Sequence, residues 1–509
     1  MEIISANVKN KWLLKGNVVC GNMKKMVLIW LLLFALLALA FTFKAERVRA
    51  SPKDIWVPYN YPTIQAAINA ADPGDVIHVA SGTYDPIVVN KTVSLIAEGE
   101  AIIDGSHNYK TVVNITANNV VFKNFKIQRP DWSGTLIFID SATFCMVENN
   151  YLIGDGYCLV GVFLWQASNC HITHNTIINV TGGGDWFNAK GILLQGSSNN
   201  YIVANNIYNS WDCIALESSS NLNLVSDNNA TPPQYSSIYY TFRGILISES
   251  SNNTVTGNWI SNCTSSSWAI RLTPRASYNL IYHNNFINNV RQAKVENTTN
   301  IWYDDWPAGG NFWSNHVSPD NCSGQHQNEQ GSDGICDNYY TIDEDLHVID
   351  AYPLMGPCNR FEVQFGPFPS KQEISVISNS SISGFQMNTT QKTISFNVTG
   401  ESGMGFCRVD IPSVIVSGLW QNNYRVLVND QEPLYVRNWT SDATTYIYFQ
   451  YQHSTKEVVI VPEFQSALIP ILLMLSTIII SIKKLSHRKN NQPSFIFPFH
   501  LPDKHQSSC

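Results

Sequence analysis

The chain has 509 residues, of which 14% are charged and 12% aromatic, and its formal net charge is -7. This length exceeds what one ordinary hydrophobic core needs, so we expect two or three modules. Charged residues are scarce compared with roughly 25% in an average soluble protein, so amides and hydroxyls must build the polar surface. Nucleic-acid binding needs a concentrated basic stripe, which the sequence lacks, and that function class is excluded.

Residues 1–50 form a predicted signal segment. Lys24-Lys25 precede the apolar run 26–43, and Val48-Arg49-Ala50 fits a cleavage site. The residues before Met23 lack this pattern, which makes Met23 a candidate for the true start. An uncleaved anchor is the alternative, because an apolar run of this length can just cross a bilayer.

The first phrases after the signal predict a short helix followed by short strands. They are Tyr61-Pro-Thr-Ile-Gln-Ala-Ala-Ile-Asn-Ala-Ala71, Pro73-Gly-Asp-Val-Ile-His-Val79, Gly82-Thr-Tyr84 and Ile102-Ile-Asp-Gly105. This opening resembles pectin-lyase-like parallel β-helices, and most closely the NosD-type family. The resemblance implies a right-handed parallel β-helix whose first phrase is an amphipathic helix that plugs the open end. The spacing of Ile64, Ala67 and Ile68 suits such a cap.

The central region repeats with spacings of 23 to 31 residues. Each repeat has an apolar residue, an asparagine and a second apolar residue, and a phrase such as Gly191-Ile-Leu-Leu194 precedes it. Short strands of period two between Gly and Asn turns predict β-helix coils over residues 52–300, with asparagines stacked at a bend. The recurring asparagines are Asn124, Asn150, Asn175, Asn206, Asn258 and Asn285, with a weaker copy at Asn229.

Two sets of residues in the coils are candidates for contact with a polysaccharide. Loop tryptophans beside aspartates offer a flat face to sugars and a hydroxyl acceptor, which predicts carbohydrate binding. These residues are Trp132, Asp185, Trp186, Trp211 and Trp306. Asp212-Cys-Ile-Ala-Leu216 resembles a phrase of polygalacturonase-like glycosidases, although Trp211 replaces the first carboxylate. Lys190, Asp212 and Arg243 precede equivalent strands and are weak catalytic candidates, and their position in turns explains them without catalysis.

Residues 301–357 form an acidic, Gly-rich closing segment. Its phrases Gly309-Gly-Asn-Phe-Trp-Ser314 and Asp350-Ala-Tyr-Pro-Leu354 extend the family resemblance to the end of the β-helix. Hard oxygen ligands on a flexible loop suit Ca²⁺, whereas ordinary turns of solvated carboxylates are the alternative. The candidate calcium ligands are Asp320, Asp333, Asp337 and Asp343.

Cysteine usage indicates an oxidising compartment. Cys322 with Cys336 and Cys358 with Cys407 are the disulfide pairs that we expect, whereas Cys145 and Cys170 form either a bond or a stack of buried thiols. A copper cluster is not expected, because methionines are scarce and the histidines fall in different repeat registers. These histidines are His171, His174, His283, His316 and His326.

Residues 358–460 contain alternating runs that predict a small β-sandwich. An apolar run at 466–482 then predicts a transmembrane helix, and the basic cluster after it places the tail 483–509 in the cytoplasm. The tail resembles archaeal surface proteins that carry a Pro-Glu-Phe sorting signal, at Pro462-Glu-Phe464 here. The tail continues beyond Lys489 for longer than such a signal usually does. Whether the anchor is retained or removed by proteolytic sorting therefore stays open.

Twelve glycosylation sequons occur, all between the two apolar segments. This distribution predicts that the ectodomain lies outside the cell. The acceptors are Asn90, Asn114, Asn179, Asn229, Asn252, Asn262, Asn297, Asn321, Asn379, Asn388, Asn397 and Asn438.

The first hypothesis is a membrane-anchored cell-surface glycoprotein without catalytic activity that binds carbohydrate or has a structural role in the envelope. The alternative is a calcium-dependent polysaccharide lyase or glycoside hydrolase, which requires Lys190, Asp212 and Arg243 to converge in a groove. A third option, an accessory protein for an exported metalloenzyme, is implied by the family resemblance alone.

Overall fold

The computed structural model describes residues 51–463 except 107–109, 129–133, 156–157, 183–188, 235–240, 265–266, 297–298, 368–369 and 442. The chain divides into two compact units, Met1–Lys53 and Asp54–Cys509, and the helices and strands from Asp54 onward belong to the second. The predicted signal segment (1–50, with Met23), transmembrane helix (466–482) and tail (483–509) lie outside the described residues. Within the described part of the chain, no helix has the length and apolar character needed to cross a bilayer.

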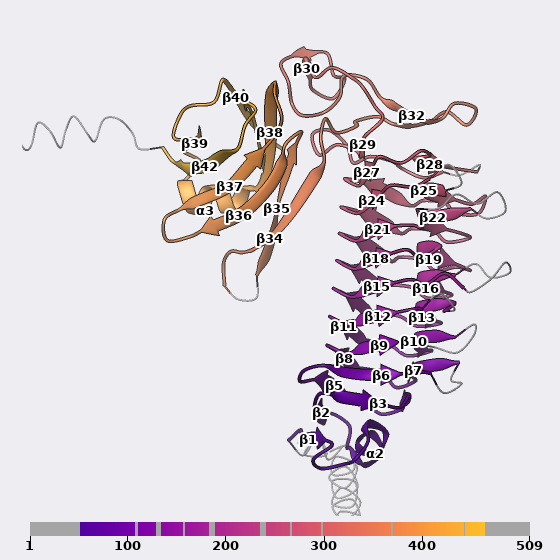
Figure 1. Cartoon of the computed structure of the whole chain (residues 1–509). Coiled ribbons are helices and arrows are strands. Elements are labelled where there is room, and N and C mark those ends of the chain that lie inside the picture. The colour runs from indigo at the N-terminus through magenta and orange to yellow at the C-terminus, as the bar shows by residue number, and fades with distance from the viewer. Residues whose placement is uncertain are drawn as a thin grey trace, which may run out of the picture. The chain divides into compact units, whose positions relative to one another are not determined.

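The coils of the β-helix build three parallel sheets, and each coil adds one strand to each sheet (Figure 1). Sheet A consists of β1 (Asp54–Val57), β2 (Val76–Val79), β5 (Ser94–Ala97), β8 (Val121–Lys123), β11 (Met146–Glu148), β14 (His171–Thr173), β17 (Tyr201–Val203), β20 (Leu224–Ser226), β23 (Thr254–Thr256) and β26 (Leu280–Tyr282). Sheet B consists of β3 (Gly82–Tyr84), β6 (Ala101–Asp104), β9 (Lys126–Gln128), β12 (Tyr151–Ile153), β15 (Thr176–Ile178), β18 (Asn206–Tyr208), β21 (Asn229–Thr231), β24 (Trp259–Ser261), β27 (Asn285–Ile287) and β29 (Phe312–Trp313). Sheet C consists of β4 (Ile87–Val89), β7 (Thr111–Ile115), β10 (Thr135–Asp140), β13 (Val160–Trp165), β16 (Lys190–Gln195), β19 (Asp212–Glu217), β22 (Phe242–Ile247), β25 (Ser267–Leu272) and β28 (Ala293–Lys294).

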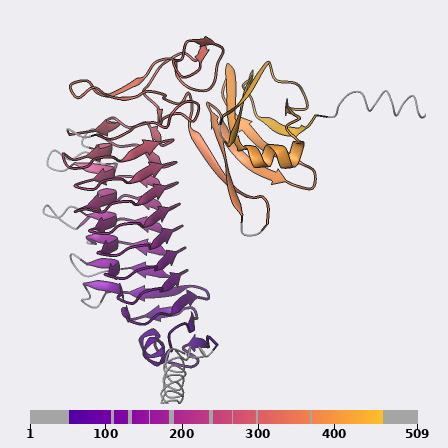
Figure 2. The same cartoon turned by 180° about the vertical axis from the view of Figure 1, so that it is seen from behind.

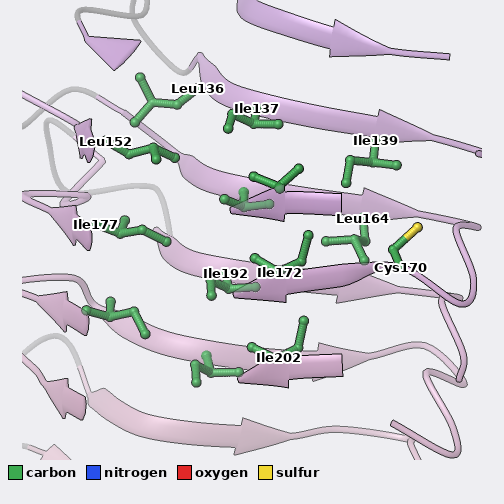
Figure 3. Close-up of a cluster of buried hydrophobic side chains, with 14 of the residues drawn as sticks. Leu136, Ile137, Ile139, Leu152, Leu164, Cys170, Ile172, Ile177, Ile192 and Ile202 are labelled. Carbon is green, nitrogen blue, oxygen red and sulfur yellow. The ribbon is translucent and has the colours of Figure 1, made fainter. Parts of the chain in front are cut away.

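The core lies inside the coils, between the three sheets. Equivalent residues of successive coils pair in register, so that Ile172 lies beside Ile202 and Leu152 beside Ile177. Figure 3 shows these aliphatic side chains in stacked rows, and Figure 2 shows the stacked strands from the other side. Full burial of such a side chain contributes about 1.5–3 kcal/mol, and each coil repeats the contribution.

The predicted helix is α2 (Ile64–Ala70), and it covers the first coils. Thr63 caps it, because its hydroxyl accepts a hydrogen bond from the Ala66 amide at 3.1 Å. Ile64, Ala67 and Ile68 are its buried residues and join the hydrophobic core of the coils. The spacing of these three residues predicted this buried face correctly.

Two asparagine ladders connect the coils at their corners. The first, between sheets A and B, consists of Asn150, Asn175, Asn205, Asn228, Asn258, Asn284 and Asn311. The second, between sheets C and A, consists of Asn200, Asn223, Asn253, Asn279 and Asn300. In both, the Nδ2 of every member except the last donates to the Oδ1 of the member in the next coil, which satisfies these buried amides.

The sequence prediction of the first ladder was off by one residue in three coils. Asn206, Asn229 and Asn285 each follow the true ladder residue, and they belong to strands of sheet B. At Asn124 the ladder is not yet present, because the next residue, Phe125, is buried and its amide donates to Asn150. Neighbouring asparagines cannot be distinguished until the backbone shows which one points inward.

The closing segment contains two small antiparallel pairs before the sandwich begins. They are β30 (Cys322–Ser323) with β31 (Glu329–Gln330), and β32 (Tyr340–Asp343) with β33 (Val348–Asp350). The sandwich has a five-stranded sheet of β34 (Cys358–Gln364), β35 (Lys371–Ser378), β38 (Met404–Pro412), β41 (Thr444–Gln452) and β40 (Tyr435–Ser441). Its four-stranded sheet has β36 (Ser381–Asn388), β37 (Thr393–Thr399), β42 (Lys456–Pro462) and β39 (Tyr424–Val428), and α3 (Ser413–Trp420) packs into the core that the two sheets share.

Arg408 of β38 connects the sandwich with the closing segment. Its guanidinium is fully buried and forms an ion pair with Asp410 at 2.8 Å. It also donates to the carbonyl oxygens of Pro307 and Ala308, the latter at 2.9 Å, and lies 4.8 Å from the ring centre of Tyr446. The buried Arg408 guanidinium therefore connects the closing segment to the sandwich. The Asp410 carboxylate and the two carbonyl oxygens compensate its positive charge.

Candidate functional site

The structure brings together the three weak catalytic candidates on the outward side of sheet C. Lys190 and Arg243 lie in the strands on either side of Asp212 and in register with it. Lys190 Nζ is 2.6 Å from Asp212 Oδ2, and the Arg243 guanidinium binds both carboxylate oxygens, at 2.5 and 3.0 Å. Lys190 also lies 3.4 Å from Glu217. The result is a compact network of two cations and two carboxylates.

This network is closed to solvent rather than arranged around a groove. Asp212 has no exposed surface, and Lys190 and Arg243 are also buried. Leu193, Ala215 and Leu246 form a small apolar cluster on the next outward positions of the same strands, and they too are buried. A base or acid must reach its substrate, so the geometry favours a structural ion network over a catalytic one.

The tryptophans predicted to bind sugar divide into three groups. Trp211 is only 6% exposed and packs 5.6 Å from Phe242 in the main core, so its predicted role in binding is wrong. Trp306 is half-buried, and its indole N–H donates to Asp333 at 3.0 Å, which occupies its polar edge. Trp132, Asp185 and Trp186 lie outside the described residues.

The four acidic residues predicted to bind calcium act as acceptors within the closing segment. Asp320 accepts the amides of Asp333 and Gly334, both at 3.0 Å, and Asp337 accepts those of Asn321 and Cys322. Asp343 accepts the Leu346 amide at 3.1 Å. Within the described ranges, no three His, Cys, Asp or Glu side chains lie close enough to share a metal ion. Calcium binding therefore stays a prediction, and among the described residues these carboxylates do not converge on a common point that a metal ion could occupy.

Two carboxylates of this segment have strongly raised pKa values. Burial raises the pKa of Asp320 to about 7, against the lowering effect of the hydrogen bond from the Asp333 amide. Burial likewise raises the pKa of Asp350 to about 7, although the Asn311 amide and the Trp313 indole donate to it at 2.7 and 2.9 Å. Asp350 thus terminates the first asparagine ladder by accepting from its last member.

The predicted disulfides are wrong, because all four cysteines are free thiols. In the antiparallel sheet, Cys358 of β34 lies opposite Ile377 of β35, and Cys407 of β38 lies opposite Ser378 of β35. The two cysteines therefore flank β35 on opposite edges. Successive residues of a strand point to opposite faces, so the two sulfurs lie in different cores. Cys336 contacts the Met355 sulfur at 3.4 Å, whereas Cys322 is only partly buried. Cys145 and Cys170 are also free and buried, which makes them a stack of thiols.

A surface feature that the sequence analysis missed lies at the corner between sheets C and A. The residues just before four members of the second ladder, and the equivalent residue Asn169 of the preceding coil, have a positive φ. These residues are Asn169, Asn199, Leu222, Asn252 and Tyr278, and Leu222 and Tyr278 are 58% and 68% exposed. A hollow of about 310 Å³ lies across these coils, lined by Asn169, Asn199, Tyr201, Leu222, Asn252 and Thr254 among others. The recurring residue before a ladder asparagine is the signal that could have revealed it.

Most of the predicted glycosylation acceptors are accessible. Eleven of the twelve lie in the described part of the chain, Asn297 being the exception, and nine of these eleven are exposed. Asn179 is half-buried, and so is Asn114, whose Oδ1 is buried without a hydrogen-bond partner. The exposed acceptors are Asn90, Asn229, Asn252, Asn262, Asn321, Asn379, Asn388, Asn397 and Asn438.

Comparisons with known proteins agree with this architecture. Residues 69–318 match the model of a family described as "Periplasmic copper-binding protein (NosD)". A curated relative, a cell surface glycoprotein of Methanothermus fervidus, is 26% identical over 358 residues, which are 58% of this chain and 57% of the relative. The chain thus spans a little more than half of the length of that relative.

Two of the solved structures that are similar to the chain have low sequence identity and low TM-scores. An alginate lyase from Paenibacillus sp. str. FPU-7 has 15% identity and a TM-score of 0.35, covering 51% of this chain and 97% of that chain. PfbA, a surface adhesin of Streptococcus pneumoniae, has 12% identity and a TM-score of 0.33, covering 58% of this chain and 98% of that chain. No functional conclusion follows from these values.

The family description names copper, but the described residues do not fit a copper site. Burial lowers the pKa of His283 to about 4, and its Nε2 lies 3.1 Å from the Ala308 carbonyl oxygen. His316 Nε2 lies at the same distance from the Asn338 carbonyl oxygen, and His171 stacks on Tyr201. Since no cluster of metal-binding side chains occurs among these residues, we derive no function through copper. Residues 69–318 are similar to the NosD family, and their parallel coils are consistent with that match.

Proposed function

We propose that this protein is an N-glycosylated component of the outer cell surface and that its β-helix is a rigid scaffold without catalytic activity. The observation that carries the proposal is the exposure of nine sequon asparagines, which extend over both the β-helix and the sandwich. Because these side chains are exposed, the folded protein can carry glycans at all nine positions. The two ladders and the continuous core supply the rigidity, because they tie every coil to its neighbours.

The similarity to a cell surface glycoprotein supports this location. Ser466–Ile482 is proposed as the anchor, with the basic residues that follow it on the cytoplasmic side. In this arrangement the β-helix and the sandwich both belong to the ectodomain. The partners of the protein are then the lipid bilayer and the surrounding envelope glycans.

Glycopeptide mass spectrometry of the full chain from a host that attaches N-glycans tests the proposal. We expect occupancy at most of the nine exposed acceptors and much lower occupancy at Asn114, whose amide oxygen is buried. Protease treatment of intact cells must cleave the sandwich, and detergent must be needed to extract the chain. Unmodified acceptors throughout, or a chain protected inside intact cells, would refute the proposal.

A calcium-dependent polysaccharide lyase or glycoside hydrolase is the second candidate. The convergence of Lys190, Asp212 and Arg243 favours it, whereas their burial opposes it. Incubation of the ectodomain with uronate and neutral polysaccharides, with and without Ca²⁺, distinguishes the two candidates. Release of unsaturated or reducing products, abolished in Asp212→Asn, would establish the enzyme. Binding without turnover would support the scaffold.

A further inference from the structure

The hollow at the corner between sheets C and A is formed by two parallel rows of residues. Asn169, Asn199, Leu222 and Asn252 belong to the turn that precedes sheet A, one in each successive coil. The second row runs along sheet A itself, where the strand register places His171, Tyr201, Leu224 and Thr254 side by side. Because neighbouring coils are about 4.8 Å apart, Tyr201 lies roughly 10 Å from the coil of Asn252.

The lining has the chemistry of a surface for neutral sugars. All of its side chains are uncharged, and several are primary amides, which both donate to and accept from hydroxyl groups. The exposed amides of Asn199 and Asn252 face solvent. Tyr201 is 43% exposed and is held flat by stacking on His171, with ring centres 4.5 Å apart and planes 6° from parallel. A sugar ring can pack its C–H face on such an aromatic surface.

One wall of the hollow is itself a glycosylation acceptor. Asn252-Asn253-Thr254 is a sequon, and both Asn252 and Thr254 line the hollow. Asn253 is the buried ladder residue between them, and it fixes the backbone, so Asn252 keeps its outward position. A glycan attached to Asn252 therefore starts inside the hollow, and Leu222 and Leu224 are the next residues towards Tyr201.

We propose that the N-linked glycan of Asn252 docks in this hollow, with its first sugars over Leu222 and Leu224 and a later sugar on Tyr201. The proposal rests on the proposed function, since it requires that the chain is N-glycosylated. The docked glycan covers apolar surface that the coil leaves open, which explains how a leucine can be 58% exposed at this corner. The hollow thereby becomes a site for the protein's own glycan.

Hydroxyl-radical footprinting of the glycosylated full chain tests the docking. We expect Tyr201 to be protected from oxidation when Asn252 carries its glycan, and to become reactive in Asn252→Gln and in Thr254→Val, which both destroy the sequon. Tyr208 is the matched control, because it has a similar exposure of 41% but lies on sheet B. Thr254→Ser keeps the sequon and must keep the protection.

A thermodynamic cycle supplies a second measurement. Tyr201→Ala is expected to lower the thermal midpoint more in the glycosylated chain than in the Asn252→Gln background, because only the first loses a sugar contact. Equal shifts in the two backgrounds, or an equally reactive Tyr201 with and without the glycan, would overturn the docking. An empty Asn252 beside occupied acceptors would refute this inference and leave the proposed function intact. Absence of glycans at every acceptor would refute both.

Discussion

Replacing Asn205 with alanine removes one member from the middle of the first ladder. Its Nδ2 donates to the Ile172 carbonyl oxygen at 2.7 Å and to Asn228 Oδ1 at 3.0 Å, and its Oδ1 accepts the Asn175 amide at 3.0 Å. The side chain has no exposed surface, so water cannot replace these contacts. The substitution removes the side-chain partners of two buried backbone groups, which at about 1–3 kcal/mol each predicts a loss of about 2–6 kcal/mol.

Asn206→Ala is the matched control for this loss. Asn206 is the next residue, but it is only half-buried, and its side chain accepts from Asn229 Nδ2 at 2.7 Å near the surface. We expect this variant to lose less than about 1 kcal/mol, as is usual for a hydrogen bond that water can replace. Urea unfolding of the two variants and of the unmodified chain measures the difference.

Hydrogen exchange locates the effect within the coils. The amide of Asn175 should lose protection in Asn205→Ala, because the side chain that accepts from it is missing. Amides of β1 and β2, several coils away, should keep theirs, since each coil contacts only its neighbours. If Asn205→Ala is no more destabilising than Asn206→Ala, the ladder does not contribute to stability as we reason.

Three further predictions concern buried charges. Arg408→Ala should cost about 3–5 kcal/mol, because it leaves the buried Asp410 carboxylate unpaired, whereas the exposed Arg425→Ala should have little effect in the same denaturation assay. Asp212→Ala should cost a similar amount through the uncompensated Lys190 and Arg243, and near-neutral stability would contradict the closed ion network. The raised pKa of Asp350, about 7, means that the folded chain keeps a proton which the unfolded chain loses near pH 4. The stability that this group contributes is therefore fully present below about pH 4 and is lost as the pH rises through about 7, and Asp350→Asn should flatten this part of the pH profile of the unfolding free energy.

The β-helix could be predicted from the sequence because its determinants are local and repeated. An inward aliphatic such as Ile172, Ile202 or Val225 recurs in every coil, and the recurrence alone indicates stacked strands. The short helix at Ile64–Ala70 was likewise predictable from the spacing of its apolar residues. The position of the ladder within each Asn-Asn pair was not, because it depends on which residue the backbone turns inward.

The candidate site was harder to predict because burial is a property of the folded coil. Trp211 and Trp132 both stand beside an aspartate in the sequence, and both were expected in loops. Trp211 belongs to the core instead, which its neighbours in the sequence do not indicate. The convergence of Lys190, Asp212 and Arg243 followed from their register, but their burial did not. The disulfide predictions failed for a related reason, since closeness in sequence order says nothing about which face of a strand carries a sulfur.

The register of the coils also makes length an adjustable property of this fold. Neighbouring coils present the same inward rows to the coil on each side, as the pairing of β14 with both β11 and β17 shows. Duplicating one coil would create one additional interface of the same kind and lengthen the stack by about 4.8 Å, while the capping helix and Asp350 could still terminate its two ends. Evolution can therefore change the reach of such a protein in fixed increments without redesigning its core.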